Sequence, residues 1–77
     1  MFLLYRTDCR HSVTSKILIA ICDAKEKVID VAEEYCIQDH VFFSADDILN
    51  LELKSQTQGL KTNYELIVET LSVNQFV

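Results

Sequence analysis

The side chains of this chain that could do chemistry are concentrated in two short polar tracts, of which residues 8–12 form the first. Asp8, His11 and Ser12 are the residue types of a nucleophilic triad, in which the imidazole activates the hydroxyl. Neighbours in one short loop rarely reach that geometry, and residues 7–12 contain no glycine to let main-chain donors approach an oxyanion. We therefore expect either a loop capped by Asp8 and Ser12 or a loop that contacts a ligand or partner.

The second tract is Gln56-Thr57-Gln58-Gly59, in which uncharged polar side chains precede the only glycine of the chain. Such residues suit a turn network or the recognition of a small polar ligand. Gly59 is expected to adopt a left-handed conformation that closes the helix or turn. Together with two acids that follow Ser44, the candidate binding residues are Asp8, His11, Ser12, Asp46, Asp47, Gln56, Thr57 and Gln58. The pattern indicates no catalytic residue.

Two cysteine–histidine pairs, Cys9-x-His11 and Cys36-x3-His40, supply four residues of the types that bind zinc. The first spacing is not typical of a zinc site, and Cys36 also fits a buried helical stripe. We expect neither metal nor cofactor. Whether the four side chains converge is a question for the structure.

Charge is distributed unevenly along the chain, whose net charge is −5. Residues 1–22 hold three basic residues against one acid, and residues 23–77 hold four lysines against eleven acids. Seven basic residues in an acidic chain neutralise few phosphates, so nucleic acid is not the expected ligand. The acidic part could contact a basic partner surface or simply keep the protein soluble.

The apolar pattern predicts five elements in the order strand-strand-helix-helix-strand. Strands are expected at residues 2–7 and 64–71, from alternating apolar positions. Residues 16–22 fit either a strand or the start of a long helix, and their isoleucine content favours the strand. A helix is expected over 24–37, with a start signal in Asp23 and Glu26, and a second follows Ser44 and ends near Lys54. Residues 41–43 are expected to anchor an extended segment in the core.

These elements predict a single α+β domain spanning residues 1–77. The expected architecture is a three-stranded antiparallel sheet with two helices on one face (β-β-α-α-β), the first strand lying in the middle. So small a sheet leaves strand edges and part of one face uncovered, which favours self-association or the addition of a partner's strand.

The cellular setting follows from three cysteines and from the N-terminal sequence. The first residues lack the basic region of a secretory signal, and no apolar run approaches the roughly 20 residues that span a membrane. An odd number of cysteines suits a reducing compartment. We expect a cytoplasmic protein with free thiols and no membrane contact.

Several short motifs, which together cover most of the chain, resemble short uncharacterised proteins of bacterial mobile elements and phages. These motifs are Leu3-Leu4-Tyr5-Arg6-Thr7-Asp8, His11-Ser12, Leu18-Ile19-Ala20, Leu49-x-Leu51 and Gln56-Thr57-Gln58-Gly59. The resemblance implies no particular activity. It implies a genomic setting in which small inhibitor or regulator proteins are common.

The function expected from these observations is that of a small, acidic, non-enzymatic interaction protein. It would bind another protein as an inhibitor or adaptor and would form a homodimer. The alternative is a small-ligand binding module, for a nucleotide or metabolite, that uses the 8–12 and 56–59 loops. This alternative requires the two loops to lie close together.

Overall fold

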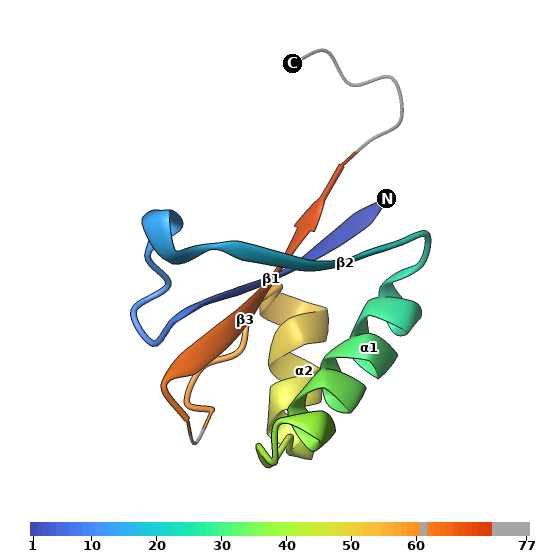
Figure 1. Ribbon diagram of the computed structural model, residues 1–77. Coiled ribbons are helices and arrows are strands. Elements are labelled where there is room, and N and C mark those ends of the chain that lie inside the picture. The colour runs from blue at the N-terminus through green and yellow to red at the C-terminus, as the bar shows by residue number, and fades with distance from the viewer. Residues whose placement is uncertain (61, 72–77) are drawn as a thin grey trace.

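A computed structural model describes residues 1–60 and 62–71. Its elements are β1 (Phe2–Asp8), a single 3-10 turn (Val13–Ser15), β2 (Ile17–Cys22), α1 (Lys25–Gln38), α2 (Ala45–Lys54) and β3 (Tyr64–Thr70). The strands form one antiparallel sheet in the order β2-β1-β3, and both helices lie on the same side of it (Figure 1). The expected α+β fold, with β1 in the middle, is confirmed.

The pairing of β1 with its two neighbours differs in regularity. Against β3 the register is continuous from Phe2–Thr70 to Asp8–Tyr64. Against β2 it shifts by one residue, because Leu4 pairs with Ala20 and Tyr5 with Leu18. Ile19 is thus the extra residue of a β-bulge, which bends and twists the strand that carries it. Residues 17–22 form a strand, as their composition favoured.

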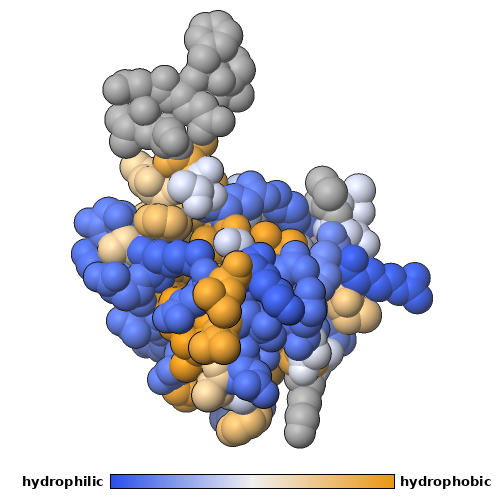
Figure 2. Space-filling view, turned by 180° about the vertical axis from the view of Figure 1, so that it is seen from behind, coloured by the Kyte–Doolittle hydropathy of each residue, from blue (hydrophilic) through white to orange (hydrophobic). Residues whose placement is uncertain are grey.

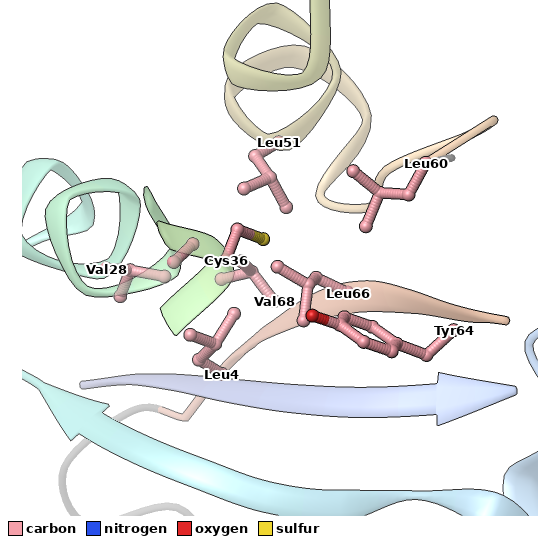
Figure 3. Packing of buried hydrophobic residues seen from close by; sticks show 9 residues of the cluster. Leu4, Val28, Cys36, Leu51, Leu60, Tyr64, Leu66 and Val68 are labelled. Atoms are coloured by element: carbon pink, nitrogen blue, oxygen red, sulfur yellow. The ribbon is translucent and has the colours of Figure 1, made fainter. Parts of the chain in front are cut away.

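The core lies between the sheet and the two helices (Figure 3). Alternate residues of β1 and β3, namely Leu4, Leu66 and Val68, point toward the helices and are buried. The stripe of α1 is buried against them, and α2 contributes Leu51. Nine buried residues make up this cluster: Leu4, Val28, Ala32, Cys36, Leu51, Leu60, Tyr64, Leu66 and Val68.

The two helices begin differently. Ser44 caps α2 as expected, and a reciprocal bond from its own N–H to Asp47 completes a capping box. The start signal proposed for α1 is wrong, because Ala24 is the N-cap and makes no side-chain cap bond. Asp23 lies one residue too early and pairs instead with Lys27 at 2.9 Å. That exposed pair lowers the pKa of the Asp23 carboxyl.

Segment 55–57 extends the sheet beyond β3. Ser55 ends α2 in a left-handed conformation (φ 59°), and its carbonyl accepts a hydrogen bond from the Val68 N–H at 2.8 Å. Thr57 N–H donates to the Leu66 carbonyl at 2.9 Å. Gly59 is left-handed as expected (φ 86°) but lies in the turn that follows, because Ser55 has already closed the helix.

Phe42, which was expected to help anchor residues 41–43 in the core, is exposed, and so is Leu53 of α2. Phe42 is 70% exposed, whereas Val41 and Phe43 pack against the core, because successive side chains of an extended segment point to opposite sides. Leu53 is 75% exposed because the helical repeat turns it away from the stripe that contains Leu51.

Candidate binding surfaces

The carboxylate of Asp8 holds the 8–12 loop. Its Oδ1 accepts hydrogen bonds from the main-chain N–H groups of Arg10 and Ser12, both at 3.0 Å. These bonds, chiefly that of Ser12, lower the pKa of the Asp8 carboxyl. Ser12 contributes to the hydrogen bonds of this loop through its main chain, since its carbonyl accepts from the Ser15 hydroxyl at 2.7 Å. The expectation of a capped loop is confirmed for Asp8.

His11 connects the two polar tracts. It has a positive φ of 58°, and its Nε2 lies 3.0 Å from the carbonyl oxygen of Thr57, 46 positions away in the sequence. A carbonyl only accepts, so Nε2 carries the hydrogen and donates it. The two tracts therefore meet, as the ligand-binding alternative requires. With its hydrogen directed at Thr57, Nε2 offers no lone pair to a neighbouring hydroxyl.

A buried carboxylate, that of Glu65, organises the second tract. Its side chain accepts from the Thr57 hydroxyl at 2.7 Å and from the N–H groups of Gly59 and Leu60, both at 3.2 Å. The Thr57 hydroxyl in turn accepts from the Leu66 N–H at 2.8 Å. Glu65 is only 4% exposed, although the strand pattern alone does not distinguish it from Glu69. The sequence signal that could have identified Glu65 as buried is the preceding turn at Gly59 and Leu60, whose main-chain N–H groups need an acceptor.

A polar hollow of about 320 Å³ lies between the start of α2 and the 58–59 turn. Asp46, Asp47 and Gln58 line it together with Phe42, Ser44 and Gly59. Within this group Asp47 is buried and committed to the capping box, where its Oδ2 accepts from the Ser44 N–H at 2.8 Å. Asp46 and Gln58 remain exposed.

The eight predicted binding residues thus fall into separate places. A hydrogen-bonded chain joins Asp8, Ser12, His11 and Thr57. Asp46, Asp47 and Gln58 surround the polar hollow. Gln56 forms a bridge with Ile67 at the margin of the sheet. No residue of the 8–12 loop is among those that line the hollow.

The strand β2 presents a surface that the list of candidate residues missed. It is an edge strand, and no described residue forms a strand on its outer side. Its six residues, ILIAIC, include no charge and no proline, two of the features that protect an edge, although the strand does contain the bulge at Ile19. Leu18 is 47% exposed and Ile21 is 56% exposed.

The main-chain groups of β2 that point outward can be deduced from the other strands. The hydrogen bonds of Leu66 and Val68 to segment 55–57 show that the even residues of β3 point away from β1. Main-chain groups alternate along a strand, so the odd residues of β3 and β1 face each other and the even residues of β1 face β2. The bond from the Asp8 N–H to the Ser15 hydroxyl, at 2.9 Å, agrees with this direction.

Register then assigns the groups of β2 itself. Cys22, Ala20 and Ile17 lie opposite Phe2, Leu4 and Arg6, so their main-chain groups face β1. Leu18 and Ile21 lie opposite odd residues of β1, so their N–H and C=O groups point away from the sheet. The bulge at Ile19 is the reason that an even and an odd residue share this direction. We call the outward main-chain groups of β2, with the side chains of Leu18 and Ile21, the free β2 edge.

The free β2 edge borders the face of the sheet that carries no helix. Tyr5 lies on this face opposite Leu18, and Lys16 is placed with its Nζ 4.3 Å from the centre of the Tyr5 ring. Lys16 also forms an ion pair with Glu69. Beyond the edge, on the α1 side, Ile21, Cys22 and Val31 contribute to a mainly apolar hollow of about 570 Å³.

Exposed apolar residues are also found elsewhere on the molecule. Figure 2 shows a face on which hydrophobic residues form a band bordered by hydrophilic ones. The large exposed apolar side chains are Met1, Ile17, Leu18, Ile21, Ile37, Phe42, Leu49, Leu53 and Leu71. The free β2 edge differs from the rest because its exposed side chains belong to a strand of the sheet whose outward main-chain groups have no partner among the described residues.

The cysteines are free thiols in different surroundings. Cys9 is exposed, Cys22 is half-buried against the core, and Cys36 is buried, where desolvation raises its pKa to about 11.

The Tyr64 hydroxyl points toward the middle of the core and has no hydrogen-bond partner among the described residues (Figure 3). In the described part of the chain, no three His, Cys, Asp or Glu side chains are arranged to hold a metal ion.

A polar contact also connects β1 to α1. The Arg6 guanidinium donates to the Tyr35 hydroxyl at 2.9 Å and lies 4.2 Å from the centre of the Tyr64 ring. The bond to Tyr35 is the main cause of the raised pKa of Arg6. This group connects sheet and helix, and it places a cation over an aromatic face.

No protein-family model, curated protein or solved structure matches this chain. Within residues 1–60 and 62–71, no helix is both long enough and apolar enough to cross a membrane.

Proposed function

We propose that this is a small, non-enzymatic interaction protein that binds another protein chain, as an inhibitor or adaptor in the cytoplasm of a bacterium that carries a phage or mobile element. The observation that carries the proposal is the free β2 edge. Exposed main-chain groups give affinity for an extended segment of a partner, and the flanking side chains give selectivity. Leu18 and Ile21 supply these side chains.

The charge around the edge supports a basic partner segment. α1 packs beside β2, and its outward side chains include Glu26, Asp30, Glu33 and Glu34, all of them exposed. A strand added at β2 would lie near these acids, so lysine or arginine in the partner would meet opposite charge. Such a complex is expected to weaken as salt concentration rises.

Capture experiments with edge variants test the proposal. The wild-type protein, Leu18→Lys and Leu53→Lys are immobilised and exposed to lysate of the native host, and any captured protein is purified and re-bound. We expect the wild type and Leu53→Lys to retain the same partner and Leu18→Lys to lose it. Leu53 is a matched control because it is an exposed leucine on α2. Equal capture by all three, or by none, would overturn the proposal.

A second candidate function is a small-ligand binding module, and the contact between His11 and Thr57 favours it. The polar hollow beside Gln58 and Asp46 is the cavity that a nucleotide or metabolite would use, and of the two loops only 56–59 contributes to its lining. Thermal shift against a panel of such compounds tests this function. A binder should lose its effect in Gln58→Ala but keep it in Gln38→Ala, an exposed control on α1. A panel without any shift contradicts the idea.

A further inference from the structure

We infer that the free β2 edge pairs with the same edge of a second copy, giving an antiparallel dimer with a continuous six-stranded sheet. The inference rests on the proposed function, since the second copy occupies the same edge, where a segment of any other partner would compete with it. Among the described residues each protomer offers one such edge, because segment 55–57 already pairs with the outer side of β3 at residues 66–68. Pairing of the two edges therefore closes at two copies.

The bulge determines the register of this pairing. In an antiparallel pair, outward-pointing residues must lie opposite outward-pointing residues. On the free β2 edge these are Leu18 and Ile21. Both of them find such a partner in one register only, in which Leu18 lies opposite the partner subunit's Ile21 and Ile21 opposite the partner subunit's Leu18. The twofold axis passes between Ile19 and Ala20, and the two bulges face each other there. In a strand without the bulge, Leu18 and Ile21 would not share a direction.

The charges at the two ends of β2 favour this arrangement over a parallel one. Lys16 precedes the strand and Asp23 follows it, with no charge between them. The antiparallel register brings each Lys16 next to the partner subunit's Asp23. A parallel register would instead place like charges side by side. Lys16 and Asp23 already pair with Glu69 and Lys27 inside each protomer, so the dimer joins two existing ion pairs.

The same register predicts a specific cross-link that uses a natural cysteine. Ile17 and Cys22 both face β1, so Ile17 lies opposite the partner subunit's Cys22 in a pair without direct main-chain hydrogen bonds. Cα atoms of such pairs are about 4.5 Å apart, within the range that a disulfide spans. Within one protomer the two positions are five residues apart along the strand, roughly 16 Å, too far for a disulfide.

The test introduces Ile17→Cys in a Cys9→Ser background, with oxidised glutathione as the oxidant. We expect a covalent dimer on a non-reducing gel that disappears on reduction and on the further change Cys22→Ser. Leu18→Cys is the matched control, one residue out of register, and should cross-link little. Equal cross-linking of both variants would overturn the register.

Light scattering gives an independent measurement that does not need a cysteine variant to fold. The wild type and Leu53→Lys should have dimer mass at tens of micromolar. Leu18→Lys should raise the dimer dissociation constant about tenfold or more, because symmetry makes the substitution act twice. Monomer mass for the wild type, together with no cross-link in the Ile17→Cys variant, overturns the dimer. The capture experiment is scored separately, so failure of the dimer and failure of partner binding are distinguishable.

Discussion

At the scale of single residues, the carboxylate of Glu65 accepts hydrogen bonds from main-chain N–H groups that have no neighbouring strand to bond to. It accepts from the Thr57 hydroxyl and from two main-chain N–H groups, in a place that water does not reach. In Glu65→Gln one oxygen becomes an NH2 group that faces these donors. We expect the free energy of unfolding to fall by about 1–3 kcal/mol in urea titrations. The exposed Glu52→Gln is the control, and an equal loss there would contradict the assigned role.

The buried thiol of Cys36 gives the stability a defined dependence on pH. Its pKa rises from 9.0 to about 11 on burial, so the folded state binds its proton more tightly than the unfolded state. This contribution is complete below pH 9 and is lost as the pH rises through about 11. Urea titrations at pH 8 to 11 should show a steeper loss for the wild type than for Cys36→Ala. Cys9→Ser, which changes an exposed thiol, should leave the slope unchanged.

At the scale of elements, the two helix starts predict opposite effects of substitution. Ser44→Ala removes the capping box of α2 and should cost about 1 kcal/mol of unfolding free energy. Ala24→Ser supplies the side-chain acceptor that α1 lacks and should stabilise by about the same amount. Thermal and urea unfolding of both variants measure these changes. No gain in Ala24→Ser would show that the start of α1 is constrained by its short connection to β2.

The elements also show which features a sequence can predict. Local patterns were sufficient for all three strands, both helices and the cap at Ser44, because each depends on periodicity or on a few neighbouring residues. The central place of β1 was also predicted, but no local pattern specifies it. The bulge at Ile19, the pairing of segment 55–57 with β3 and the burial of Glu65 arise from contacts between distant segments. For that reason the free β2 edge was expected only as an unspecified exposed edge, and its residues could not be named.

The same distinction, between features set by neighbouring residues and features set by contacts between distant segments, applies to the candidate site. The two polar tracts meet because of the path that the chain takes between them. The sequence could not predict that contact and could only identify it as a requirement of the ligand-binding alternative. The loop role of Asp8 was predictable, because short polar side chains bond main-chain donors nearby. The structural role of Thr57 was not, since its partner Glu65 lies on another element.

At the scale of the whole molecule, the proposed dimer predicts that protection of certain amides depends on concentration. Ile17, Ala20 and Cys22 point their N–H groups at β1, so their exchange with solvent hydrogen should be slow in monomer and dimer alike. Leu18 and Ile21 point theirs outward, so these amides should exchange rapidly in dilute protein and slowly at high concentration.

NMR-detected hydrogen exchange at two concentrations separates the possible outcomes. Slow exchange at Leu18 and Ile21 in the concentrated sample alone supports the pairing of two copies. Rapid exchange of both amides at every concentration leaves the edge free for another chain and contradicts the dimer. Slow exchange at every concentration, in a protein of monomer mass, would mean that the chain covers its own edge, and the proposed binding surface would then be unavailable to any partner.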